Sequence, residues 1–172
     1  MRGLTQTVAG VLAIAAVSTA ADFVWATWII QPQTAHGLVH GAVLFLAIGL
    51  VLGLVTNRPA AGAAAGLIAG LLAAGTFYLL SPAIGFSAMF VAWFGVWVAL
   101  AFVYAWLQGT RAGTGTAVSR GIVAAIGSGL AFYLISGIWR PFNPEGLDYL
   151  VHFGAWTAAY LPGFAALLLS RR

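Results

Sequence analysis

Cysteine and lysine are both absent from the chain, and only three residues are acidic. Without cysteine, no disulfide, thiolate metal site or iron–sulfur cluster can form. Without lysine, no Schiff base to retinal or to a carbonyl substrate can form. The sequence also has no glycine-rich phosphate loop, no HExxH pair and no nucleophile elbow. It therefore predicts no catalytic residues and favours a role other than catalysis.

Charged residues of either sign are scarce, since they make up 6% of the chain against 62% hydrophobic residues. Together with a mean hydropathy of +1.01, this excludes a water-soluble globule and indicates an integral membrane protein. A hydrocarbon core of about 30 Å needs roughly 20 apolar residues per helix. Six segments meet this requirement and occupy most of 1–172 as a single transmembrane domain: about 7–30, 37–55, 61–81, 86–107, 117–138 and 148–169.

Internal similarity suggests how these spans are organised. Most connections between them are short, which favours antiparallel hairpins. The segment Phe77–Ser81 resembles 132–136, and in the second helix of each predicted hairpin His40 corresponds to Trp93 and then to His152. We therefore expect an all-α, polytopic bundle of six helices, built from three pseudo-repeated helical hairpins.

The arginines indicate the orientation of the chain in the membrane. Six of the seven fall at the termini and the even-numbered connections, whereas Arg140 alone lies on the other side. The positive-inside rule then places both termini in the cytoplasm, and we expect the inner or plasma membrane of a prokaryote. Because the arginines do not gather on one face, we expect the lipid bilayer and no nucleic acid as partner. The six are Arg2, Arg58, Arg111, Arg120, Arg171 and Arg172.

The N-terminus allows a competing interpretation. Arg2, the apolar run 8–17 and the small residues 18–20 resemble a signal peptide. The apolar run continues to Ile30, however, which is long enough to span a membrane. We therefore expect the first segment to be a transmembrane helix.

Small residues recur at four-residue spacing in the odd-numbered predicted helices. In lipid, such stripes let helix backbones approach closely and gain dispersion contacts. We therefore expect them to be helix contact faces. The stripes consist of Ala9 and Ala13, of Gly62, Gly66 and Gly70, and of Gly121, Ala125 and Gly129.

Polar side chains within the spans are few, and each is costly unless it faces a partner, a cavity or water. His36 and His40 lie four residues apart, as do Asp148 and His152, so each pair shares one helix face. On the predicted topology these residues and Asp22 fall in the outward half of the membrane. We expect an outward pocket that binds a small solute or ion. Its predicted binding residues are Asp22, His36, His40, Trp93, Asp148 and His152.

The longest outward connection carries Arg140 and Glu145 on either side of two prolines that stiffen it, and it is predicted to form a lid over the pocket. Two cofactors are open alternatives. A haem would be clamped between His40 and His152. A divalent metal would be held by His36, His40, His152 and Asp148.

These residues favour a membrane-embedded binding or transport protein, because imidazole titrates near neutral pH and a carboxylate beside it tunes that titration. In length and six-helix plan the chain resembles the substrate-binding components of energy-coupling factor transporters, although none of that family's diagnostic motifs is present. Two alternatives remain. One is an accessory structural subunit of a larger membrane complex, with partner subunits in the membrane, and the other is a bis-histidine membrane cytochrome.

Overall fold

The structure is a computed structural model that describes residues 2–29, 34–109, 113–136 and 148–169. Within these ranges it is helical, as the sequence predicts. The elements are α1 (Arg2–Trp28), α2 (Thr34–Val55), α3 (Pro59–Ile84), the 3-10 turn η1 (Gly85–Ser87), α4 (Ala88–Leu107), α5 (Thr114–Ser136) and α6 (Asp148–Leu168).

Five helical stretches in the described ranges are long and apolar enough to cross a membrane. The longest, Pro59–Leu107, contains α3, η1 and α4. Their length and hydropathy confirm an integral, multi-pass membrane protein whose helices suit contact with a lipid bilayer.

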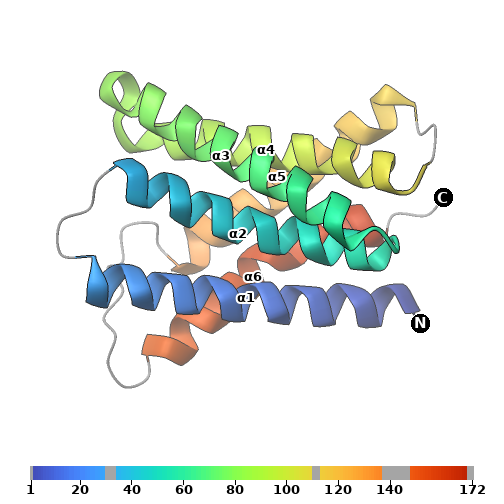
Figure 1. Ribbon diagram of the computed structural model, residues 1–172, viewed down its shortest axis with the longest axis horizontal. Coiled ribbons are helices and arrows are strands. Elements are labelled where there is room, and N and C mark those ends of the chain that lie inside the picture. Colours follow the sequence, from blue (N-terminus) through green and yellow to red (C-terminus); the bar gives the residue numbers. More distant parts are fainter. Residues whose placement is uncertain (1, 30–33, 110–112, 137–147, 170–172) are drawn as a thin grey trace.

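The helices are arranged as a closed ring. Each α-helix packs against the next in the chain, and α6 packs against α1, while α4 also contacts α2 and α6. Figure 1 shows the start of α1 and the end of α6 at one end of the bundle, which we call the terminal end. The end of α1 and the start of α2 lie at the other end, which we call the site end.

Glycines bring α2 and α3 into backbone contact. A Cβ added to Gly66 would lie 2.9 Å from the Cα of Gly49, and one added to Gly62 would lie 2.7 Å from the Cα of Gly53. Both distances are shorter than real Cβ contacts, so only glycine fits along this seam. The prediction that the α3 stripe is a contact face is confirmed, and the close approach aligns α2 and α3 along most of their length.

The predicted contact face of α1 was wrong. Ala9 and Ala13 are exposed, whereas Val11, Ile14 and Ala15 are almost fully buried. In an alanine-rich helix, small residues match four-residue spacing on more than one face. The bulkier Val11 and Ile14 fill the space between helices, and their dispersion contacts decide which face turns inward.

Several helix ends extend beyond the predicted apolar segments. α1 begins at Arg2, ahead of the predicted 7, and α3 continues through Pro82 to Ile84 instead of ending at 81. Pro82 lacks the N–H that would bond the Tyr78 carbonyl, and the Ser81 hydroxyl donates to that oxygen instead, at 3.4 Å. Backbone hydrogen bonding therefore carries these helix ends past the apolar segments.

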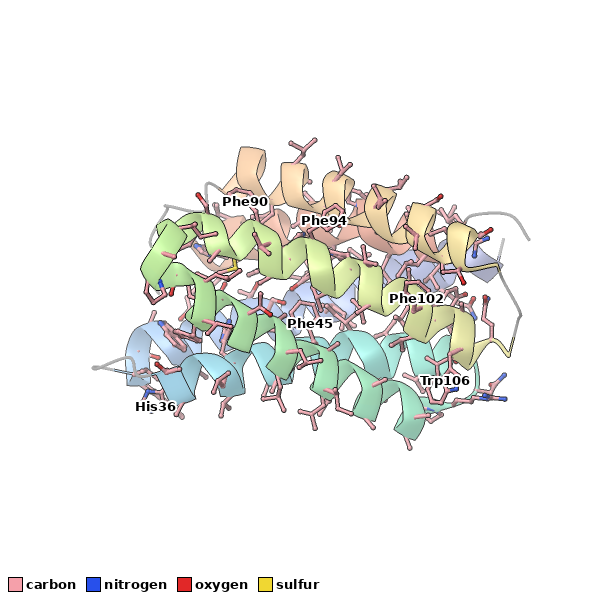
Figure 2. The ribbon with its side chains drawn as sticks, turned by 90° about the horizontal axis from the view of Figure 1, so that it is seen from above. His36, Phe45, Phe90, Phe94, Phe102 and Trp106 are labelled. Atoms are coloured by element: carbon pink, nitrogen blue, oxygen red, sulfur yellow. The ribbon has the colours of Figure 1, made fainter. Side chains whose placement is uncertain are left out.

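The core consists of large side chains packed between the helices, and other aromatic residues point outward. Trp97 and Phe164 are fully buried. Figure 2 shows Phe90, Phe94 and Phe102 along α4, and each is about two-fifths exposed. These three side chains therefore suit contact with lipid.

Candidate functional site

The site is organised around one carboxylate on α1. Asp22 lies six residues before the end of α1, and its Oδ2 accepts a hydrogen bond of 2.7 Å from the indole Nε1 of Trp156 on α6. Trp156 is 8% exposed and the side chain of Asp22 is 19% exposed. The carboxylate is therefore largely removed from water and held by a donor from the opposite end of the chain.

Two imidazoles flank this carboxylate from different helices. His40 Nε2 on α2 lies 3.8 Å from Asp22 Oδ1, and His152 Nδ1 on α6 lies 3.6 Å from Asp22 Oδ2. Both distances exceed those of a direct hydrogen bond, so the three groups form a loose polar cluster. Asp22 Oδ1, on the His40 side, can therefore accept a hydrogen bond from a solute.

A second polar contact between α1 and α6 lies one helical turn further from the site end. The hydroxyl groups of Ser18 and Tyr160 are 3.0 Å apart, and both residues are buried. Ser18 precedes Asp22 by four residues and Tyr160 follows Trp156 by four, so both contacts share one interface between antiparallel helices. Together they fix α1 against α6 at the base of the site.

A cavity of about 460 Å³ lies beside Asp22 and His40 and is lined by all six α-helices and η1. Its wall is mainly apolar and aromatic. His40 meets the ring of Trp25 edge to face, with centroids 5.4 Å apart. Other aromatic lining residues are Phe45, Phe77, Phe86, Trp93 and Phe132.

Stacked rings hold one side of the cavity in place. Phe132 of α5 lies between Trp93 of α4 and Trp156 of α6, with centroid distances of 5.6 and 4.9 Å and interplanar angles of 19° and 28°. Trp156 also stacks on Tyr160 at 5.2 Å. The donor to Asp22 is thus fixed by rings from α5 and α6. The Trp93 nitrogen is buried and close to Gly129, so Trp93 presents its ring, not its N–H, to the cavity.

The structure brings together only part of the predicted binding set. Asp22, His40 and Trp93 line the cavity, and His152 approaches Asp22 from α6. His36 is exposed and Asp148 is half-buried in the first turn of α6, and neither lines the cavity. Figure 2 shows His36 near the site end, whereas Phe45 lies nearer the middle of the bundle. The predicted lid residues Arg140 and Glu145 lie outside the described residues.

The predicted cofactor ligands are likewise only partly brought together. Within the described ranges, no group of three or more His, Asp or Glu side chains is placed to hold a metal ion. Of the four predicted metal ligands, His40 lines the cavity and His152 of α6 lies beside Asp22. His36 and Asp148 do not line the cavity. His40 and His152, the predicted haem ligands, each lie beside Asp22 instead.

Trp156 and Phe132 belong to the site but not to the predicted binding set. A signal for Trp156 is present in the sequence, because it follows His152 by four residues and so shares its helix face. Phe132 is the counterpart of Phe77 in the predicted internal repeat, and both line the cavity.

No protein-family model, no curated protein and no solved structure matches this chain. The function is therefore argued from the geometry of the site alone.

Proposed function

We propose that this protein binds a small, mainly apolar solute that carries a positive charge or an N–H donor, and passes it across the membrane. The observation that carries the proposal is the position of Asp22. It is a largely buried carboxylate on the wall of an otherwise apolar cavity, with one oxygen held by Trp156 and the other facing His40 at 3.8 Å.

The charge of the cavity wall selects against anions. Among the lining residues that the structure describes, Asp22 is the only carboxylate and none is an arginine. A charge in a medium of low polarity needs a partner of opposite sign. An ammonium group or a ring N–H meets this need, whereas an anionic solute would face the Asp22 charge with only imidazole to offset it.

The aromatic wall favours the same class of solute. Ring faces attract cations within about 6 Å of their centroids, most strongly for tryptophan. Trp25 and Trp93 both line the cavity that contains Asp22. The volume of about 460 Å³ suits a molecule of one or two rings, since small-molecule pockets measure about 300–1,000 Å³.

The proposal includes six membrane passes with both termini in the cytoplasm. A 49-residue helical stretch would measure about 70 Å if straight, far more than one crossing of about 30 Å requires. The packing of α3 against α4 supports two passes within Pro59–Leu107. The three related hairpins find support in matched positions that share the cavity wall, namely His40 with Trp93 and Phe77 with Phe132.

A path across the membrane would run from the Asp22 cavity to the terminal end, where a second cavity lies. The buried side chains of Ile48, Leu52, Trp97, Leu100 and Phe164 belong to the core of the bundle. We infer that this core closes the path between the two cavities and that transport requires the helices to shift around it. Solute entering from the site end would first meet the Asp22 cavity.

The proposal is tested with three probes that share one ring and differ in charge: benzylamine, benzyl alcohol and benzoate. Binding to the purified protein in detergent is followed by tryptophan fluorescence, because Trp25, Trp93 and Trp156 line the cavity. We expect benzylamine to bind more tightly than benzyl alcohol, and benzoate to bind least. Asp22→Asn keeps an acceptor for Trp156 but removes the charge, and should abolish the preference for benzylamine over benzyl alcohol.

Asp148→Asn is the matched control, since it removes a carboxylate that does not line the cavity. This variant should keep the order of the three probes. The proposal fails if benzoate binds as well as benzylamine, or if Asp22→Asn leaves the preference for benzylamine intact. Uptake of radiolabelled benzylamine by proteoliposomes then tests passage separately from binding.

A further inference from the structure

The second cavity lies at the terminal end of the bundle and has a volume of about 460 Å³. Its mouth differs in chemistry from the Asp22 cavity, because hydrogen-bond donors line it from several elements. These donors are Gln6 of α1, Arg58 of the α2–α3 connection, Gln108 after α4 and Arg120 of α5. We propose that this cavity is a binding site for a phosphate-type oxyanion, a site distinct from the one where the solute binds.

Charge is the first argument for this site. Arg58 and Arg120 both line the cavity, and the described lining contains no carboxylate. Asp22 and Asp148, the acidic residues that the structure describes, lie toward the site end. Guanidinium groups present a planar set of donors that matches two oxygens of a phosphate. Two of them at one cavity therefore favour an anion with several oxygens.

The second argument is backbone geometry, which fixes the position of the Arg58 backbone. Asn57 has a φ of 60° and ends α2 in the left-handed conformation. The amide of Arg58 donates to the carbonyl of Gly53 at 2.7 Å, and that of Asn57 donates to Leu54 at 3.3 Å. This pair of bonds is the pattern of a Schellman cap. The connection is therefore a defined turn that presents Arg58 at the cavity without further ordering.

The position of Arg120 is set by the packing of α5 against α4. A Cβ on Gly121, the next residue, would lie 2.6 Å from the Cα of Val98 on α4, so the two backbones are in contact at this level. Arg120 itself is half-buried. The inner end of the cavity is closed by Tyr104, Leu107 and Leu167, which are buried. The donors therefore lie at the mouth, at the level of the helix ends.

Two sources offer this chemistry at the helix ends of a membrane protein: the phosphate of an anionic lipid headgroup and a soluble phosphate. The probes are inorganic phosphate, compared with chloride at equal ionic strength, and phosphatidylglycerol, compared with phosphatidylcholine. Stabilisation by phosphate is measured as a shift of the thermal unfolding midpoint, and retained lipid is measured by native mass spectrometry. The double variant Arg58→Gln with Arg120→Gln should weaken binding about tenfold or more.

The control variant is His36→Gln, which changes an exposed side chain at the start of α2, away from this cavity, and should leave binding unchanged. Arg58→Gln alone changes an exposed side chain, and is expected to lose several-fold in affinity even if the double variant unfolds. Saturable stabilisation by phosphate supports a soluble ligand, and selective retention of phosphatidylglycerol supports a headgroup. The proposal is overturned if the wild-type protein shows neither, or if the control variant loses as much as the double variant.

Discussion

Trp156 donates its indole N–H to Asp22 at 2.7 Å, across 134 residues of sequence. This bond joins the end of α1 to the beginning of α6 at the point where the helix ring closes. It also turns one oxygen of the carboxylate toward α6 and leaves the other on the His40 side of the cavity. The same contact thus contributes to closure of the bundle and orients the site.

Trp156→Phe should destabilise the protein, because it keeps the stacked ring but leaves a largely buried carboxylate without its donor. We expect a loss of about 1–3 kcal/mol in the free energy of unfolding. The measurement is denaturant unfolding in a fixed detergent. Trp106→Phe is the control, since Trp106 is 57% exposed, and its effect should be close to zero. Equal losses in the two variants would show that the bond to Asp22 contributes nothing of its own.

His40→Ala combined with His152→Ala should remove binding of benzylamine while leaving the protein folded. Both imidazoles flank Asp22, and their removal strips the carboxylate of its polar neighbours on α2 and α6 apart from Trp156. We expect affinity to fall at least about tenfold, measured by tryptophan fluorescence.

His36→Ala provides the comparison for the histidine pair. His36 lies one helical turn before His40 but is exposed, so its replacement should leave affinity unchanged. If His36→Ala weakens binding as strongly as the double variant, the cavity assignment is wrong.

Gly66→Ala should destabilise the α2–α3 seam, because its Cβ would meet the backbone of Gly49 at 2.9 Å. Neither backbone can yield without separating the helices, so we expect a loss of about 1–3 kcal/mol. The measurement is thermal or denaturant unfolding of the purified protein.

Gly75→Ala makes the same chemical change further along α3, where an added Cβ meets nothing within 4 Å. This control should be neutral or stabilising by up to about 1 kcal/mol, because alanine favours the helix over glycine. A stabilising effect of Gly66→Ala would contradict the close approach of α2 and α3.

The absence of cysteine makes the topology directly testable with single-cysteine variants. Asn57→Cys and Gly109→Cys should react with a membrane-impermeant maleimide from the cytoplasmic side, and Ser87→Cys from the opposite side. These positions flank α3 and α4, so the pattern distinguishes two passes from one. If Asn57→Cys and Gly109→Cys are labelled from opposite sides, the six-pass topology is wrong.

Several features of the site could be anticipated from residue type and spacing. Asp22, His40 and His152 stand out because polar groups are costly inside a membrane, and the structure places the two imidazoles beside the Asp22 carboxylate. His36 shows the limit of this reasoning. It shares a face with His40 by spacing, yet it lies one turn nearer the helix end and is exposed.

The stripes of small residues in α3 and α1 also differ in how well the sequence predicts their role. Gly62 and Gly66 identify a contact face because glycine at four-residue spacing lets two helix backbones approach closely. Ala9 and Ala13 do not, because alanine is tolerated equally toward lipid and toward protein, and both are exposed.

The sequence by itself determined that this is a helical, multi-pass membrane protein, because only helices satisfy the backbone of apolar segments of this length in lipid. It also determined which polar groups must find partners. Only the tertiary structure decided those partners, bringing Trp156 to Asp22 and stacking Phe132 between two tryptophans. The reason is that the apolar periodicity of a membrane helix specifies no unique face, so its rotation is decided by contacts with helices distant in the chain.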